Sequence, residues 1–281
     1  MIESLEEGLR ENPDDWNAWL VYGDHLTAMG DVRGELIRLE HAHAMSFRDN
    51  ARSRRLYGER RALEKPHEAA WRCGLPNDFE VELSHGFIRA LRVPHDFAEL
   101  LPTLREFLAR PDSRFCTRFA FKAWRVVREG ADPELSTLPF THLRELSLAY
   151  VQTGSVLKEA VRAPWFSRLT ALHLQYCALG DDGLAPLVGL SMPRLRTLSL
   201  QENRLTAAGV KALAKVDAPA LVELDLRHNA LGPEGARALV ELPWLPKLKR
   251  LSLRPLDVGA GEGVLARSNL PDALRRVWRR A

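Results

Sequence analysis

Cysteine is scarce in this sequence, and long apolar runs are absent from it. Only three cysteines occur among 281 residues, Cys73, Cys116 and Cys177, and their spacing does not match that of metal ligands. A small, odd number of cysteines is typical of proteins from a reducing compartment. No run of 18 apolar residues occurs, so we expect no helix that spans a membrane. Acidic residues fill the segment 1–15, where a signal peptide would need a basic flank, and we therefore expect a cytoplasmic protein.

Motifs of catalysis and of cofactor binding are missing as well. The sequence has no phosphate-binding glycine loop, no nucleophile motif and no cluster with metal-ligand spacing. Asp24 and His25 stand together as an acid and a base, but we expect Asp24 to pair locally and His25 to lie on the surface. His41 and His43 are two residues apart, and on a helix this spacing puts them on different faces. We therefore expect no enzymatic activity, no cofactor and no bound metal.

Acidic and basic residues are unevenly distributed. Residues 1–45 carry ten acidic and three basic side chains, a net charge of −7, whereas the whole chain has a net charge of +3. The remainder is therefore basic, at +10, which predicts two parts with different surroundings. The asymmetry also allows self-association, in which the basic segment 274–280, which includes Trp278, attracts the acidic segment of another copy.

Five copies of one leucine pattern fill the second half of the sequence. The pattern Leu-x-x-Leu-x-Leu starts at Leu143, Leu169, Leu195, Leu221 and Leu248, so its copies begin 26, 26, 26 and 27 residues apart. A fixed period of this length is typical of solenoid proteins, and this pattern is that of the leucine-rich repeat. It predicts a short strand in each repeat, with the leucines pointing inward and the residues between them pointing to the opposite face.

The residues after each strand predict a turn and then a helix. Asn203, Asn229 and Cys177 occupy one position of the turn, where a buried side chain can satisfy backbone groups. The helices are expected over 180–188, 206–213 and 232–240. Their caps are expected at Thr206 and Asp181, with Pro233 in a first turn and a close approach of helix to strand at Gly183, Gly209 and Gly235.

Two degenerate repeats are expected before the five clear ones, starting at Ile88 and Cys116. The array would then occupy residues 75–281, and residues 270–281 would cap its carboxyl-terminal end, because terminal repeats of a solenoid are atypical. Repeats of about 26 residues with a full helix resemble the ribonuclease-inhibitor-like class of leucine-rich repeats. This resemblance implies an α/β horseshoe with a parallel sheet inside and helices outside.

The helix start and stop signals in residues 1–72 predict a small all-helical domain. Pro13 breaks the first helix, Asp14 or Asp15 can cap the second, and Gly30 can end it in a left-handed conformation. The motifs Asn12-Pro-Asp-Asp, Trp19-Leu-Val-Tyr, Gly30-Asp and Arg33-Gly-Glu-Leu-Ile resemble, over roughly residues 1–45, a bacterial repeat-companion domain that precedes repeat arrays in myxobacteria and planctomycetes. The resemblance implies a bacterial protein and a following repeat array, and it transfers no activity.

The concave face of the array is the expected working surface, because its side chains vary without disturbing the leucine core. Tyr150 and Tyr176 are one repeat apart, and we expect them to stack about 5 Å from each other. His173 and Asp225 would be about 10 Å apart, too far for a hydrogen bond, so they do not suggest acid–base catalysis. The residues expected to bind a partner on this face are Tyr150, His173, Gln175, Tyr176, Gln201, Glu202, Asp225, Arg227, His228 and Arg254.

The sequence therefore predicts a non-enzymatic module that binds a protein partner through the concave parallel-sheet face. One alternative is a protein that binds nucleic acid or an anionic surface through the basic region 46–281, with an affinity that falls steeply with salt. Another alternative is a regulator that inhibits a partner enzyme, which would be a special case of protein binding.

Overall fold

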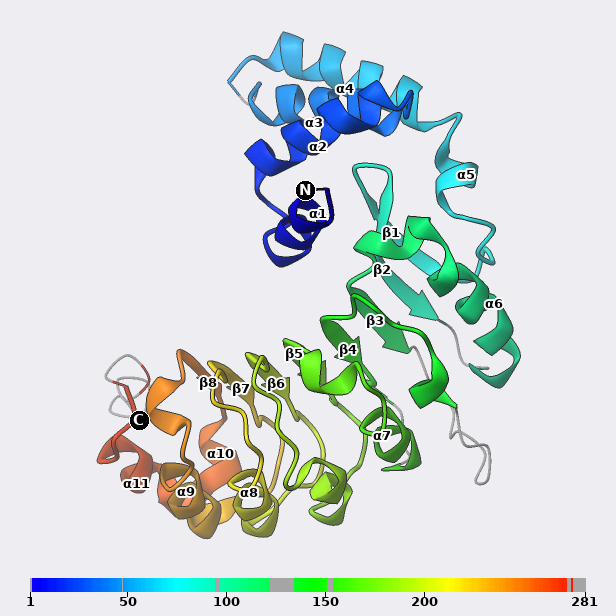
Figure 1. The fold of residues 1–281 in the computed structure, drawn as a ribbon. Helices are drawn as coiled ribbons and strands as arrows, with labels where there is room; N and C mark the ends of the chain where they lie inside the picture. The colour runs from blue at the N-terminus through cyan, green and yellow to red at the C-terminus, as the bar shows by residue number, and fades with distance from the viewer. Residues whose placement is uncertain are drawn as a thin grey trace. The chain divides into compact units, whose positions relative to one another are not determined.

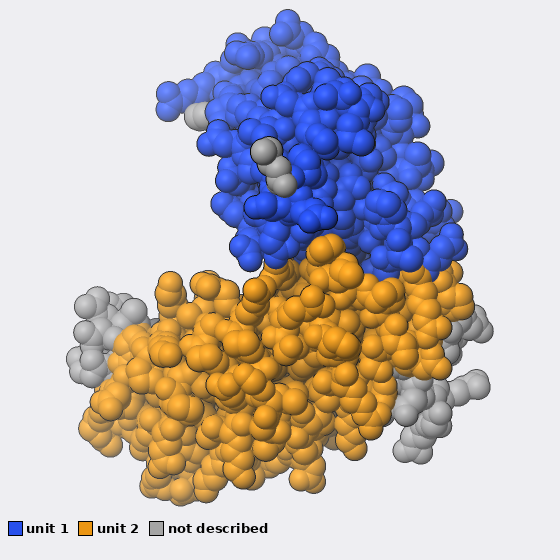
Figure 2. Space-filling view, in the orientation of Figure 1, with its two compact units in different colours: residues 1–91, 106–117 blue, residues 92–105, 118–281 orange. Residues whose placement is uncertain are grey.

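The computed structural model describes residues 2–46, 48–93, 97–121, 134–150, 154–271 and 274 (Figure 1). The chain folds into two compact units (Figure 2). Unit 1 comprises residues 1–91 and 106–117, and unit 2 comprises residues 92–105 and 118–281. The predicted carboxyl-terminal cap lies outside the described residues from 272 onward, apart from Leu274.

The described residues of unit 1 form five helices, most of a two-stranded hairpin, the end of a sixth helix and a short 3-10 helix. The helices are α1 (Ile2–Glu11), α2 (Trp16–Ala28), α3 (Arg33–Ala44), α4 (Asn50–Glu64) and α5 (Glu68–Trp71). The strands are β1 (Glu80–Ser84) and β2 (Phe87–Val93), and η1 (Pro111–Phe115) follows helix α6 (Phe97–Ala109). Residues 92–105 of β2 and α6 belong to unit 2.

The helix boundaries of residues 2–44 follow the local signals of the sequence. The carboxylate of Asp15 accepts a hydrogen bond from the Ala18 N–H at 3.1 Å and thereby caps α2. Gly30 has a φ of 74°, which a glycine adopts without steric cost, and it lies just beyond the end of α2. Asp31 then accepts a hydrogen bond from the Arg33 N–H at 2.9 Å, where α3 begins. The predicted cap at Asp15 and the left-handed Gly30 are confirmed.

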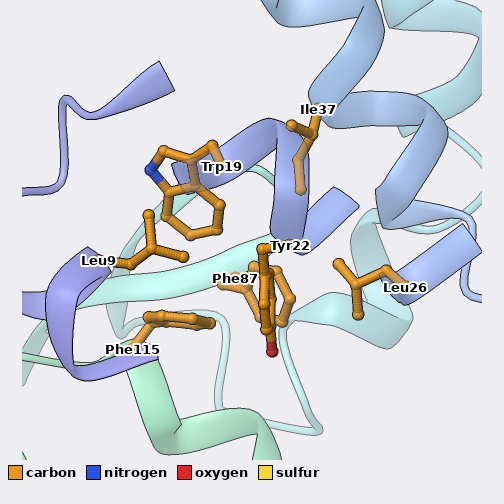
Figure 3. Packing of buried hydrophobic residues seen from close by; sticks show 7 residues of the cluster. All are labelled: Leu9, Trp19, Tyr22, Leu26, Ile37, Phe87 and Phe115. Carbon is orange, nitrogen blue, oxygen red and sulfur yellow. The ribbon is translucent and has the colours of Figure 1, made fainter. Parts of the chain in front are cut away.

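The core of unit 1 joins the helices to residues much later in the sequence. Trp19 and Tyr22 of α2 pack against Phe87 of β2 and Phe115 of η1, with ring centroids 5.2 Å apart between Trp19 and Phe115. Figure 3 shows these four rings together, with three aliphatic side chains beside them. All seven residues are buried, and they are Leu9, Trp19, Tyr22, Leu26, Ile37, Phe87 and Phe115.

The β1–β2 hairpin was not predicted. The strand β2 contains the segment 88–93 of the first degenerate repeat, but a two-residue turn at His85 and Gly86 joins it directly to β1. Both turn residues have positive φ values, 56° and 72°, as the tight turns of hairpins require. A leucine-type pattern alone does not reveal what precedes its strand, which is why the hairpin was missed.

Among the described residues of unit 2, six consecutive strands pair in parallel. They are β3 (Arg118–Phe121), β4 (Glu145–Ser147), β5 (Ala171–His173), β6 (Thr197–Ser199), β7 (Glu223–Asp225) and β8 (Arg250–Ser252). The register aligns the second leucine of every repeat, from Leu146 through Leu172, Leu198 and Leu224 to Leu251. Phe119 of β3 lies opposite Leu146, so the strand of the repeat at Cys116 has the expected register. The predicted strands of the five clear repeats are confirmed.

The segments that follow these strands in the sequence carry helices of unit 2. These are α7 (Gly154–Ala160), α8 (Ala207–Leu213), α9 (Gly232–Val240), α10 (Pro255–Val258) and α11 (Glu262–Ala266), with 3-10 helices η2 (Leu135–Thr137), η3 (Phe166–Arg168), η4 (Asp182–Leu187), η5 (Leu245–Lys247) and η6 (Gly259–Gly261). In Figure 1, α8 and α9 lie next to each other on one side of the sheet. None of the described helices is both long enough and apolar enough to cross a membrane.

Two expectations about these helices need correction. The segment 182–187 is a 3-10 helix, because Pro186 has no N–H for the bond of an α-helix back to residue 182. Asp181 does not cap this segment, since its carboxylate accepts hydrogen bonds from the N–H and the hydroxyl of Thr206, at 2.9 and 2.6 Å, one repeat later. Thr206 caps α8 as predicted, by accepting a hydrogen bond from the Ala208 N–H at 3.2 Å.

Candidate functional site

The candidate site is the strand face of unit 2. We define this face as the residues on either side of the second leucine of β4–β8, together with the two residues after each third leucine. The buried side chain of Leu146 points to one side of β4, and Glu145 and Ser147 therefore point to the other. The column after the second leucine was predicted from the sequence and the column before it was overlooked, although the same period of two reveals both. The overlooked column is Glu145, Ala171, Thr197, Glu223 and Arg250.

A left-handed residue in each of the four repeats that start at Leu143, Leu169, Leu195 and Leu221 places the side chains at the end of the strand face. Tyr150, Tyr176, Glu202 and His228 have φ values of 66°, 58°, 55° and 61°. The N–H of Tyr150 donates to the carbonyl of Gln175 at 2.9 Å, and the N–H of Tyr176 donates in the same way to Gln201 at 3.0 Å. Hydrogen bonding between repeats thus continues past the strands, and it offsets the cost of about 1–2 kcal/mol for a left-handed non-glycine residue.

Buried asparagines stabilise these turns through hydrogen bonds to the backbone. The side chain of Asn203 is fully buried, donates to the carbonyl of Leu174 at 2.6 Å and accepts from the N–H of Cys177 at 3.1 Å. Asn229 bonds in the same way to the carbonyl of Leu200 at 2.9 Å and to the N–H of Asn203 at 3.0 Å. The predicted structural role of the asparagines is confirmed.

Tyr150 and Tyr176 form a stacked pair on the strand face. Their ring centroids are 4.7 Å apart and their planes differ by 4°, which confirms the stacking expected from the sequence. The two residues are 42% and 36% exposed, so the pair is open to a partner while each ring is supported by the other. The amide of Gln201 donates to the Tyr176 hydroxyl at 2.9 Å and fixes the orientation of that ring.

A chain of polar contacts continues from the tyrosine pair to β7. Arg227 donates to the side-chain oxygen of Gln201 at 3.4 Å, and it also forms an ion pair with Asp225 at 2.6 Å. Because both ends of the Gln201 amide are occupied, its side chain is held in one orientation. The sequence placed these residues on one face but gave no indication of which pairs would form.

Other predicted residues form separate side-chain contacts. Glu202 and His228 lie 3.5 Å apart, and Arg254 lies 2.9 Å from the carboxylate of Asp257. Asp257 is buried and also accepts a hydrogen bond from the N–H of His228 at 3.2 Å. Asp257 was not predicted from the sequence, because it lies four residues after the last leucine of its repeat pattern and no other clear repeat has an acidic residue at that position.

His173 and Gln175 lie half-buried on β5 and just after it. Burial lowers the pKa of His173 from its ordinary value of 6.5, and the carboxylate of Glu145 opposes this shift. The imidazole is therefore mainly neutral at pH 7. The side-chain oxygen of Gln175 is buried and has no hydrogen-bond donor among the described residues.

No cluster of three or more histidine, cysteine, aspartate or glutamate side chains suited to a metal ion occurs in the described ranges. Asp24 pairs with Arg38 at 2.9 Å, which confirms the expected local pairing. The positions 94, 95, 122 and 123, which the repeat pattern also assigns to this face, lie outside the described residues.

Comparison with protein families identifies the repeats. The family described as Leucine Rich repeat matches residues 168–188, 192–214 and 219–240. Residues 168–240 thus contain three leucine-rich repeats. The matched segments include β5, β6 and β7 and most of the strand face described above. Leucine-rich repeats generally mediate protein–protein interaction, and proteins built from them are typically non-enzymatic. Among curated proteins, none matches this chain.

Proposed function

We propose that the protein binds a protein partner through the strand face of β4–β8. The observation that carries this proposal is the half-exposed Tyr150–Tyr176 stack, which Gln201 braces on the face. Tyrosine is frequent at the energetic centres of protein interfaces. A side chain that is already ordered in the free protein loses little conformational entropy on binding, so more of the contact energy appears as affinity.

The finer features of the fold belong to the same proposal. We infer an array of the ribonuclease-inhibitor-like class in residues 75–281, curved into a horseshoe with the strand face on its concave side. The spacing of 26 or 27 residues and the helices α8 and α9 support this class. A repeat-companion domain within 1–72 and a non-enzymatic role in a bacterial cytoplasm complete the proposal, and the three free cysteines are consistent with that compartment.

Affinity capture with matched tyrosine variants tests this function. The variant Tyr150→Ala with Tyr176→Ala removes the stack, and Tyr57→Ala removes a comparably exposed tyrosine (50% exposed) from α4, outside the strand face. We expect the wild type and Tyr57→Ala to retain the same protein from a lysate at high salt. We expect the double variant to capture at least tenfold less of this protein, and we expect its melting temperature to equal that of the wild type.

The alternatives give different results in the same experiment. Equal capture by all three proteins would place the binding site away from the tyrosine stack. Retention of nucleic acid that high salt removes equally from all three proteins would favour binding through the basic surface, because counterion release makes such affinity strongly salt-dependent.

A further inference from the structure

The strand face has a region of uncharged side chains, which the contact between Glu202 and His228 borders, and a region of internal ion pairs. We name the first the tyrosine patch, and it consists of Ala149, Tyr150, Gln175, Tyr176 and Gln201. The second is the ion-pair patch, and it consists of Glu223, Asp225, Arg227, Arg250, Arg254 and Asp257. Glu145 and His173 lie on the strands that lead to the tyrosine patch, and burial keeps the pKa of His173 low. The two patches offer different chemistry to a partner.

Charges of the ion-pair patch already have partners within the chain. Arg227 contacts Asp225 at 2.6 Å, Arg250 contacts Glu223 at 3.4 Å, and Arg254 contacts Asp257 at 2.9 Å. A partner's carboxylate that took Arg254 would leave Asp257 as an unpaired charge, and Asp257 is only 2% exposed. Such an exchange of one ion pair for another gains little, because a buried unpaired charge is strongly unfavourable.

The tyrosine patch, by contrast, has groups that are ordered and uncharged. The hydroxyl of Tyr176 accepts a hydrogen bond from Gln201 and keeps its own proton to donate. The exposed parts of the two stacked rings offer apolar surface. The side-chain oxygen of Gln175 is buried and has no donor in the described part of the chain, so a partner's donor can satisfy this acceptor only when the amide rotates outward.

We propose that the partner binds the tyrosine patch with an uncharged segment that presents aromatic or aliphatic side chains together with amide or hydroxyl groups. This inference rests on the proposed function and names the chemistry of its partner. The ion-pair patch then excludes partners with misplaced charges and adds little affinity, since like charges brought together across an interface are repelled.

Selection from a random peptide library displayed on phage tests the inference with the full-length chain. Peptides of 12 residues are selected on the wild type after depletion on the variant Tyr150→Ala with Tyr176→Ala. We expect enriched sequences with net charge near zero and a high content of aromatic, aliphatic and amide residues. Their affinity should change less than threefold between 50 and 500 mM NaCl, because exposed charges contribute little to it.

A second variant separates the two patches. Glu223→Gln with Arg250→Gln removes one ion pair without changing the net charge, and we expect it to bind the selected peptides within twofold of the wild type. Enriched peptides that are charged, lose tenfold or more in high salt and need Glu223 and Arg250 would overturn the inference and leave the proposed function standing. Peptides that bind the tyrosine double variant as well as the wild type, or no enrichment over that variant, would count against both.

Discussion

Single buried side chains stabilise the turns that follow β4, β5 and β6. Asn203 and Asn229 donate to the carbonyls of Leu174 and Leu200, and the thiol of Cys177 donates to the equivalent carbonyl of Leu148 at 3.1 Å. The same backbone position is therefore satisfied in three successive repeats by two different side chains. This explains why cysteine can replace asparagine there: both can donate a hydrogen bond and both fit a small buried space.

Replacing Asn203 with alanine should destabilise unit 2. The substitution removes the donor for the Leu174 carbonyl and the acceptor for the Cys177 N–H, and both residues are buried. Unsatisfied buried groups cost about 1–3 kcal/mol each, so we expect the free energy of unfolding to fall by about 3 kcal/mol. Urea unfolding measures the change, and Lys211→Ala, at an exposed position of α8, should stay within about 0.5 kcal/mol of the wild type. Equal midpoints for Asn203→Ala and the wild type would contradict the role of the asparagine.

His173 should make stability depend on pH. Burial lowers the pKa of His173 in the folded chain below the ordinary value of 6.5, so protonation favours the unfolded chain. The stabilisation of the folded chain by neutral His173 is fully present above pH 6.5. It is lost as the pH falls from 6.5 through the lower pKa of His173 in the folded state. We expect the unfolding free energy of His173→Gln to fall less than that of the wild type between pH 7 and pH 5, measured by urea unfolding. Parallel pH profiles for the two proteins would show that this histidine does not titrate as described.

At the scale of the element, equivalent segments of successive repeats take different helical forms. Residues 207–213 and 232–240 are α-helices, whereas residues 182–187 form a 3-10 helix that contains Pro186. The residue type near the start of each segment varies less than the helical form, because a glycine recurs there. A Cβ atom at Gly183 or Gly235 would lie 2.7 or 2.6 Å from the Cβ of the leucine four residues earlier. The predicted close approach at these glycines is therefore real, but at Gly183 and Gly235 it involves a leucine of the preceding turn, and at Gly209 it involves the Asp181 carboxylate, instead of the strand.

Two glycine-to-alanine substitutions should have opposite effects. Gly235→Ala places a methyl group 2.6 Å from the Leu231 Cβ, which has no freedom to move away, and we expect a loss of about 1–3 kcal/mol from overpacking. Gly8→Ala meets no atom within 4 Å, and in the interior of α1 it should add about 0.5–1 kcal/mol. Chemical unfolding of both variants gives the sign directly, and a neutral or stabilising Gly235→Ala would refute the steric argument.

At the scale of the whole molecule, unit 1 is held by contacts between distant parts of the chain. Trp19 and Tyr22 contact Phe115, and Arg114 donates to the Tyr22 hydroxyl at 3.0 Å. Burial and a hydrogen bond to Glu6 raise the pKa of Tyr22 to about 12. The amino-terminal helices thus share one core with β2 and η1, and their stability depends on residues that follow them much later in the sequence.

Loss of the Phe87 side chain should therefore loosen α2. Phe87 is 1% exposed and contacts Trp19, Tyr22 and Phe115, so Phe87→Ala should cost about 3–5 kcal/mol. We expect faster hydrogen exchange at the amides of α2 in the full-length protein, measured by mass spectrometry. Tyr57→Ala, at an exposed site of α4, is the matched control and should leave this exchange unchanged. Unchanged protection of α2 in Phe87→Ala would mean that the helices are stable without β2.

The sequence by itself determined the repeat register and the stacking of the two tyrosines. Each repeat contacts mainly its neighbours, so a regular spacing of leucines fixes which residues lie side by side. For the same reason the turn position of Asn203 and the alignment of Tyr150 with Tyr176 could be predicted from spacing. These features depend on local periodicity, which is visible in one sequence.

Only the tertiary structure decided which partners the polar side chains take and how unit 1 is closed. Arg227 contacts Asp225 and Gln201, and Asp181 accepts hydrogen bonds from Thr206. These pairings depend on side-chain rotamers and on distances, which the spacing of the repeats does not predict. The packing of Trp19 against Phe115 joins residues 96 positions apart, and hydrophobic burial does not depend on which apolar residues in the chain provide it. Local pattern therefore specifies the repeats, whereas long-range packing specifies the core of unit 1 and the charge pairs of the strand face.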